Sequence, residues 1–193
     1  MNGKYLFVDL KQGSQEWIEW RHNGIGASDA PVIMGKNPWK NVRDLLSKKL
    51  GPPIDDGADS KMNRGTQLEP QARNNYNQRY SSDVRPVCIQ SKTFNWLKAS
   101  IDGLSLDNKK IVEIKCGDSI YRKIKYNRTV PEYYHGQLQH ILAITGLPEI
   151  DFFCYWPGNP DLLITIPRND TYIERLINAE TLFWDKVKSS IGR

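Results

Sequence analysis

Two segments decide the fold: Ser100-Ile101-Asp102-Gly103 and Ile111-Val112-Glu113-Ile114-Lys115-Cys116. Apolar and charged residues alternate in the second segment, which is the pattern of a half-buried β-strand. The stretch 96–106 also has the composition of an extended segment, and Asp107-Asn108 is a turn dipeptide. The sequence therefore predicts a β-hairpin.

The register of this hairpin decides which residue faces Asp102. If two residues alone form the turn, Asp102 lies opposite Glu113, with Cβ atoms about 5 Å apart. With a four-residue loop, Lys115 becomes the opposite residue. Either register is expected to put Asp102, Glu113 and Lys115 on one face.

Two carboxylates in cross-strand contact repel each other unless a cation lies between them. Hard oxygen ligands suit Mg²⁺ or Mn²⁺. A lysine two residues after the glutamate can lower the pKa of an attacking water or hold a phosphate. The alternative is an exposed hairpin face with a Glu–Lys charge ladder, but the S-x-D-G segment upstream favours a metal site.

The pattern D-G…(I/V)-E-I-K-C resembles the metal-binding core of the PD-(D/E)XK nuclease superfamily, and the flanking motifs resemble the phage lambda-type exonucleases, its viral-recombinase nucleases. The resemblance extends from about Gly13 to Trp156. It implies that Asp102, Glu113 and the backbone carbonyl of Ile114 bind one or two Mg²⁺, for which Mn²⁺ can substitute. It also implies that Lys115 positions and activates the water. The sequence departs from the family pattern at Ile101, where many members have proline.

Glu69 lies in G-T-Q-L-E-P, within a helix predicted over 61–80. A single glutamate on a helix is usually a solvated side chain. The resemblance makes Glu69 a further carboxylate at the metal site, either as a direct ligand or through water.

A short helix over 15–22, capped by Ser14, is followed by glycines at 24 and 26 and a second helix over 27–35. Arg21 and Ser28 at this junction form a candidate anion site. The alternative is that Ser28 is a cap and Arg21 a surface residue. The segment W-x-x-W-R-x-x-G-I-G-A-S-D-A resembles the family's opening motif, which implies that Arg21 and Ser28 hold the DNA 5′-phosphate.

A helix is predicted over 131–145, and its segment Y-x-x-Q-x-Q resembles the family's final motif. The resemblance implies that Gln139 helps to orient the phosphate, whereas the alternative for Gln137 and Gln139 is ordinary solvent exposure. The implied 5′-phosphate clamp is then Arg21, Ser28, Ser100 and Gln139. His135 and His140 are not expected to bind metal, because the other candidate ligands are hard oxygens.

Charge is concentrated in one window of the chain. The net charge is +5, and residues 109–128 contain seven basic residues against Glu113 and Asp118. Tyr121 and Tyr126 are interleaved with them, as expected where a nucleic-acid backbone is bound and a base is stacked. The alternative is a solvated basic loop. The candidate DNA contacts here and nearby are Lys123, Lys125, Arg128 and Gln137.

Composition narrows the class of protein. The 193 residues fit one domain, 1–193, and 39% of them are hydrophobic, which is enough for a substantial core. Three widely spaced cysteines indicate neither a zinc site, a disulfide framework nor an iron–sulfur cluster. The sequence has no apolar run of membrane length and no signal-peptide pattern, so we expect a soluble protein of a reducing cytosol, the bacterial host cytoplasm if it is phage-encoded.

The expected fold is α/β (α+β): one mixed central sheet of about five strands flanked by helices. Further helices are predicted over 41–50 and 171–189, and the latter is expected to bury Ile173, Leu176, Ile177, Leu182 and Val187. The stretch 53–59 is predicted to be an acidic loop. The predicted strands are 86–91, 96–106, 111–116, 150–156 and 162–166.

The expected function is Mg²⁺-dependent 5′→3′ exonuclease action on linear double-stranded DNA. Family resemblance also implies a homotrimer and a single-strand-annealing recombinase as partner. Two alternatives remain: a structure- or site-specific endonuclease with the same core, and a catalytically inactive DNA-binding module.

Overall fold

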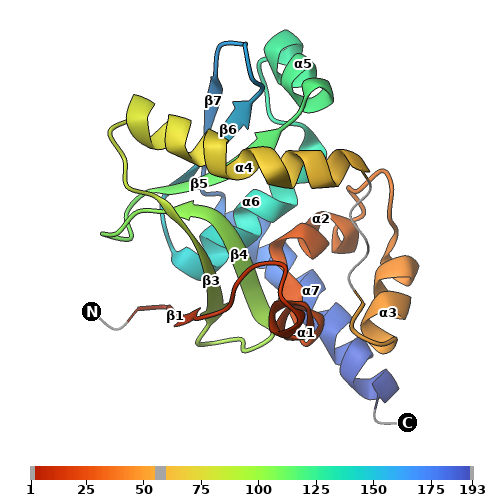
Figure 1. Cartoon of the computed structure of the whole chain (residues 1–193). Helices are drawn as coiled ribbons and strands as arrows, with labels where there is room; N and C mark the ends of the chain where they lie inside the picture. Colours follow the sequence, from red (N-terminus) through yellow and green to blue (C-terminus); the bar gives the residue numbers. More distant parts are fainter. Residues whose placement is uncertain (1–2, 55–59, 192–193) are drawn as a thin grey trace.

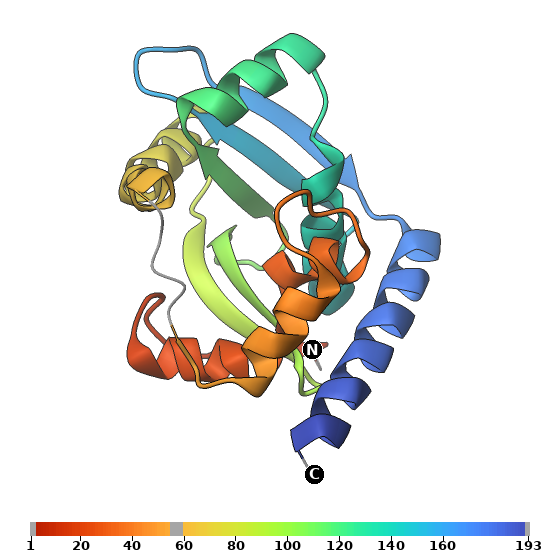
Figure 2. The same ribbon diagram turned by 90° about the vertical axis from the view of Figure 1, so that its right-hand side faces the viewer.

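The computed structural model describes residues 3–54 and 60–191, with the side chains of 60–64 and 66 left aside, so most of the predicted acidic loop lies outside the described residues. Figure 1 and Figure 2 show the chain from two sides. Its elements are β1 (Tyr5–Val8), α1 (Gln15–His22), β2 (Ile25–Gly26), a 3-10 turn (Ala27–Asp29), α2 (Ala30–Ile33), α3 (Val42–Leu50), α4 (Ser60–Arg79), β3 (Arg85–Ser91), β4 (Leu97–Leu104), β5 (Ile111–Cys116), α5 (Asp118–Asn127), α6 (Glu132–Thr145), β6 (Glu149–Tyr155), β7 (Leu162–Pro167) and α7 (Asp170–Ile191).

One mixed sheet organises the molecule, as the sequence predicts. Its strand order is β1-β3-β4-β5-β6-β7, with β2 paired to β4. β5 and β6 are parallel, as are β2 and β4, and the other pairs are antiparallel. The described chain has seven strands rather than about five. The two additional strands, β1 and β2, are four and two residues long, too short for an alternating pattern to be recognised.

Helices cover both faces of the sheet (Figure 1). α4 packs on one face through Ala72 and Tyr76. The larger core lies on the other face, where α6 and α7 contribute Leu138, Ile141 and Phe183. The expectation that Leu182 is buried is wrong, because its side chain is 73% exposed. Within the basic segment 109–128, residues 118–127 form the helix α5 rather than a loop.

The central hairpin has the register that places Asp102 across from Glu113. Gly103 pairs with Val112 and Leu104 with Ile111, and a hydrogen bond from Ser105 N to Lys110 O closes the loop. The alternative register, in which Lys115 would lie opposite Asp102, is not formed. A Cβ on Gly103 would lie 2.6 Å from Val112 Cγ1, so this close approach of the strands requires glycine.

Followed from the hairpin loop, the ladder between β4 and β5 ends at the pair Gly103–Val112, so Asp102 is the first residue of β4 beyond it. The pairing of β3 with β4 also shifts there, between the residues that pair with Arg85 and Val87. Such a shift is typical of a β-bulge, which bends a strand and re-aims its side chains. Asp102 and Glu113 therefore face each other across a gap rather than as a ladder pair.

In the described part of the chain, no helix is both long and apolar enough to cross a membrane.

Candidate active site

Glu113 is the most buried member of the site, with 1% of its surface exposed. Its Oε1 accepts hydrogen bonds from Lys115 Nζ and from Gln137 Nε2, both at 2.5 Å. Its Oε2 is buried and has no hydrogen-bond partner. A buried carboxylate oxygen without a partner is costly, which indicates that a ligand completes this site.

Asp102 occupies the gap that opens between β4 and β5. Its Oδ2 accepts the N–H of Ile114 at 2.8 Å, which is the bond that a carbonyl of β4 would make if the ladder continued. Because the N–H and C=O of a strand residue point to the same side, the carbonyl of Ile114 faces the same gap. Asp102 is thus held beside the backbone that links Glu113 to Lys115.

Glu69 and Arg73 approach the site from α4. Arg73 forms an ion pair with Glu69 one helical turn away, and its Nε donates to the main-chain oxygen of Asp102 at 2.5 Å. We call Glu69, Arg73, Asp102, Glu113 and Lys115 the acidic cluster. Sequence reasoning missed Arg73, although its i,i+4 spacing from Glu69 is the signal that would have found it.

The electrostatics of the acidic cluster favour neutral carboxyls. Burial and the nearby charge of Asp102 raise the pKa of both Glu69 and Glu113 to about 7. Burial also raises the pKa of Asp102, although Lys115 opposes this. Burial disfavours the Lys115 ammonium, but Glu113 and Asp102 hold the pKa of Lys115 above its ordinary value. Lys115 is therefore a cation at neutral pH, and negative charge exceeds positive charge in the cluster only where all three carboxyls are ionised, above about pH 7.

The donors of the acidic cluster match a hard divalent cation in chemistry. Among the described residues, no three His, Cys, Asp or Glu side chains are grouped closely enough to hold a metal ion. The oxygens that fit are those of two carboxylates, Asp102 and the unpartnered Oε2 of Glu113, together with the Ile114 carbonyl.

Arg21 and Ser28 come together as the sequence predicts. Arg21 Nη2 donates to Ser28 Oγ at 2.8 Å, and the guanidinium lies 4.5 Å from the centroid of the Trp17 ring. Trp17 Nε1 in turn donates to Ser100 Oγ at 2.8 Å. We call Trp17, Arg21, Ser28 and Ser100 the anion pocket.

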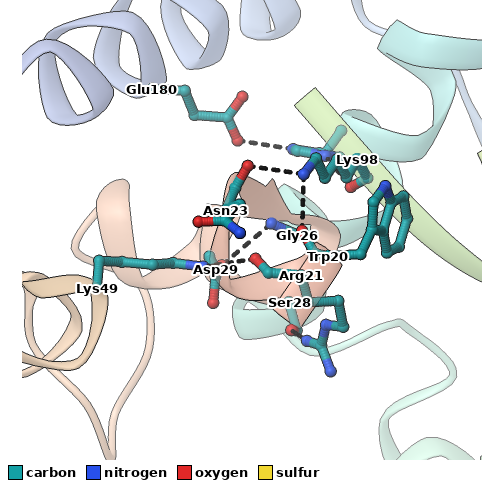
Figure 3. A network of polar contacts seen from close by, with 10 residues as sticks. Trp20, Arg21, Asn23, Gly26, Ser28, Asp29, Lys49, Lys98 and Glu180 are labelled. Carbon is teal, nitrogen blue, oxygen red and sulfur yellow. Dashed lines mark hydrogen bonds and ion pairs between the residues drawn. The ribbon is translucent and has the colours of Figure 1, made fainter. Parts of the chain in front are cut away.

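Two buried lysines fix the backbone behind the anion pocket (Figure 3). Lys49 Nζ donates to the carbonyl of Arg21 at 3.0 Å and pairs with Asp29 at 3.1 Å. Lys98 Nζ donates to the carbonyls of Trp20 and Asn23 at 2.7 and 2.6 Å. Both lysines are 5% exposed. They satisfy carbonyls at the C-terminal end of α1, which otherwise lack partners.

Gln139 contacts backbone groups rather than the other residues of the expected clamp. It is 0% exposed; its amide nitrogen donates to Pro167 O, and its amide oxygen accepts from Asn169 N, both at 2.9 Å. Its α6 neighbour Gln137 contacts Glu113 instead. His140 is also structural, because it contacts Glu180 Oε1 and Lys98 O.

The basic residues predicted to contact DNA lie in and directly after α5. Lys123, Lys125 and Arg128 are exposed, and Lys123 Nζ lies 4.9 Å from the centroid of the Tyr133 ring. Arg128 lines a surface cavity of about 380 Å³ that contains no member of the acidic cluster. Tyr121 cannot stack a base, because it is buried and donates to Pro160 O.

Comparison with known proteins identifies a family to which this chain is similar. Residues 16–148 match the YqaJ-like viral recombinase domain. The uncharacterized protein YqaJ of Bacillus subtilis (strain 168) is 31% identical over 189 residues, covering 94% of this chain and 59% of that protein. The chain thus spans about three-fifths of the length of this curated relative.

Solved structures of two exonucleases are also similar. The alkaline exonuclease LHK-Exo of Laribacter hongkongensis has a TM-score of 0.81 and 26% identity, covering 93% of this chain and 95% of its own; it is also solved in complex with dAMP with the same scores. A phage-related exonuclease from Haemophilus somnus 129PT has a TM-score of 0.60 and 13% identity, covering 87% and 96%, and supports the fold alone. The resemblance to viral-recombinase nucleases is confirmed: the chain belongs to the YqaJ-like viral recombinase domain family.

Proposed function

We propose that this chain is a Mg²⁺-dependent exonuclease that degrades linear double-stranded DNA in the 5′→3′ direction. The observation that carries the proposal is the buried contact of Lys115 with Glu113, beside Asp102 in the gap between β4 and β5. The structural similarity to an alkaline exonuclease supports the same reaction class.

In this proposal Asp102, Glu113 and the Ile114 carbonyl hold one or two Mg²⁺, with Mn²⁺ as a substitute. Glu69 contributes directly or through water. When bound, the metal supplies polarisation of the scissile phosphate and stabilisation of the leaving 3′-oxygen.

The chain's own residues orient the reactants. Lys115 keeps a fixed positive charge in the cluster, where its ammonium orients the attacking water and stabilises charge that develops on the phosphate. Gln137 and Lys115 both bind Glu113 Oε1, which leaves Oε2 directed to a ligand. Arg73 holds both Glu69 and the backbone at Asp102.

The anion pocket selects a chain end. Arg21 and Ser28, with Ser100 behind Trp17, offer a guanidinium and hydroxyls to a 5′-phosphate. A pocket for a terminal phosphate favours an end over an internal bond, which gives exonuclease rather than endonuclease action. Lys123, Lys125 and Arg128 bind the DNA backbone outside the site.

Digestion of two DNA substrates tests this function. In Mg²⁺, linear duplexes with 5′-phosphates should be degraded, while closed circular duplexes should persist. Equal cleavage of circles would favour the structure- or site-specific endonuclease.

A catalytically inactive DNA-binding module is the second alternative. If the wild type and Lys115→Ala degrade linear DNA equally poorly in Mg²⁺, that alternative is correct. By family resemblance, we also propose a homotrimer that acts with a single-strand-annealing recombinase in the bacterial cytoplasm.

A further inference from the structure

The loop between α2 and α3 presents an aromatic side chain that the proposed reaction does not use. Trp39 is 71% exposed. Asn37 Oδ1 accepts the backbone N–H groups of Trp39 and Lys40, both at 2.9 Å. This side-chain turn fixes the backbone on either side of the indole. Trp39 is therefore held in an exposed position.

The loop is also attached to the start of α6. Lys36 Nζ lies 2.7 Å from Glu132 Oε1, and the Trp39 ring meets the Tyr133 ring edge-on with centroids 4.9 Å apart. Lys123 of α5 lies 4.9 Å from the centroid of the same tyrosine ring. We call Trp39, Tyr133 and Lys123 the Trp39 platform.

A series of contacts joins the Trp39 platform to the acidic cluster. The Tyr133 and Tyr134 rings have centroids 4.7 Å apart, and Lys115 Nζ lies 5.3 Å from the centroid of the Tyr134 ring. With the Trp39–Tyr133 contact, three steps of about 5 Å each separate Trp39 from Lys115. The platform is thus within about 15 Å of Lys115, or about four nucleotides of a stacked strand.

We propose that the Trp39 platform stacks a base of the DNA strand whose phosphate occupies the acidic cluster. This inference rests on the proposed function, because it takes DNA as the substrate. Exposed rings beside cations are how proteins bind unpaired strands, and such stacking does not depend on base identity. The adjoining helix indicates that the binding partner is negatively charged, because α5 carries Arg122, Lys123 and Lys125 against one acidic residue, Asp118.

The experiment compares DNA with and without bases. The probe is a 5′-phosphorylated duplex ending in a four-nucleotide single strand, with either thymines or abasic residues in that strand. Binding to the full chain is measured by fluorescence anisotropy in EDTA, which prevents metal-dependent hydrolysis. The wild type should bind the thymine probe about 10-fold more tightly than the abasic probe.

Trp39→Ala should reduce this ratio to about 1, whereas Trp39→Phe should retain most of it, because phenylalanine still offers a ring. Leu182→Ala is the matched control, since Leu182 is an equally exposed apolar residue on α7, and it should keep the wild-type ratio.

Three outcomes would overturn the inference. These are a wild type that binds the thymine and abasic probes with equal affinity, a Trp39→Ala variant that keeps the wild-type affinity ratio, and a wild type that binds neither probe. Trp39→Ala that changes the oligomeric state while keeping the ratio would assign the surface to a second copy. The proposed nuclease fails separately, if base-dependent binding is present but linear DNA is not hydrolysed in Mg²⁺.

Discussion

The acidic cluster and the basic groups around the anion pocket are both partly buried charge networks, and they are unbalanced in opposite directions. In the acidic cluster, three carboxylates meet the cations of Lys115 and Arg73. Behind and within the anion pocket, the cations of Arg21, Lys49 and Lys98 accompany two buried carboxyls, Asp29 and Glu180, of which Glu180 contacts His140. Because unpaired buried charge is costly, each imbalance indicates the sign of an absent partner.

In the proposed function, a cation accordingly binds in one region and an anion in the other. The two regions meet on β4, where Lys98, Ser100 and Asp102 alternate along the strand. Two residues of a strand span about 6.8 Å, so β4 sets the spacing between a bound end phosphate and the acidic cluster.

The largest expected effect comes from removing one negative charge. Glu113→Gln should lower kcat on linear DNA about 10³-fold, equivalent to about 4 kcal/mol of transition-state stabilisation. The same change should stabilise the fold at pH 8. Because the pKa of Glu113 is raised to about 7 in the folded chain, the folded state holds a proton that the unfolded state releases, and wild-type stability falls between about pH 4.5 and 7.

Steady-state kinetics and urea unfolding at pH 5 and 8 check this pair of results. Glu174→Gln is the matched control, because Glu174 is an exposed glutamate on α7. A Glu113→Gln variant with unaltered kcat would contradict the proposal that the acidic cluster binds a catalytic cation.

The second effect concerns the opposite charge. Arg21→Ala should lower the rate on 5′-phosphorylated ends by about 10²-fold, the order expected for losing a positioning charge, and should affect 5′-hydroxyl ends much less. Arg122→Ala, an exposed arginine on α5, should leave the preference intact. An unchanged preference in Arg21→Ala would remove Arg21 from phosphate binding.

The smallest effect is a pH dependence of stability. Burial lowers the pKa of Lys98 to about 8, so between about pH 8 and 10.5 the unfolded chain binds more protons than the folded chain. Wild-type stability should therefore rise in this window relative to Lys98→Met, by about 1 kcal/mol. Urea unfolding of both proteins at pH 8 and 10 measures the difference, and parallel changes would show that Lys98 is not a desolvated cation.

The sequence predicted what depends on local pattern. The alternation around Glu113 identified β5, and the turn at Asp107-Asn108 identified the hairpin, for which one of the two predicted registers is observed. The end of the ladder before Asp102 was not predictable, because it arises from the shifted pairing with β3. Arg21 and Ser28 were found because a short glycine turn brings neighbouring helices together.

Long-range partners were the part that sequence reasoning missed. Lys49 and Lys98 are separated from Arg21 by 28 and 77 residues, and nothing in their local sequence indicates that they cap α1. Gln139 was assigned to the clamp by resemblance, but its position on α6 turns its amide to the backbone at Pro167 and Asn169. Such roles follow from tertiary packing rather than from periodicity.

Calorimetric titration with Mn²⁺ tests most directly whether the excess charge of the acidic cluster is that of a metal site. The wild type should show saturable binding, and Asp102→Asn, which replaces one donor without changing its shape, should bind at least about 10-fold more weakly. Equal heats for the two proteins, or a wild type that binds no ion, would contradict the account.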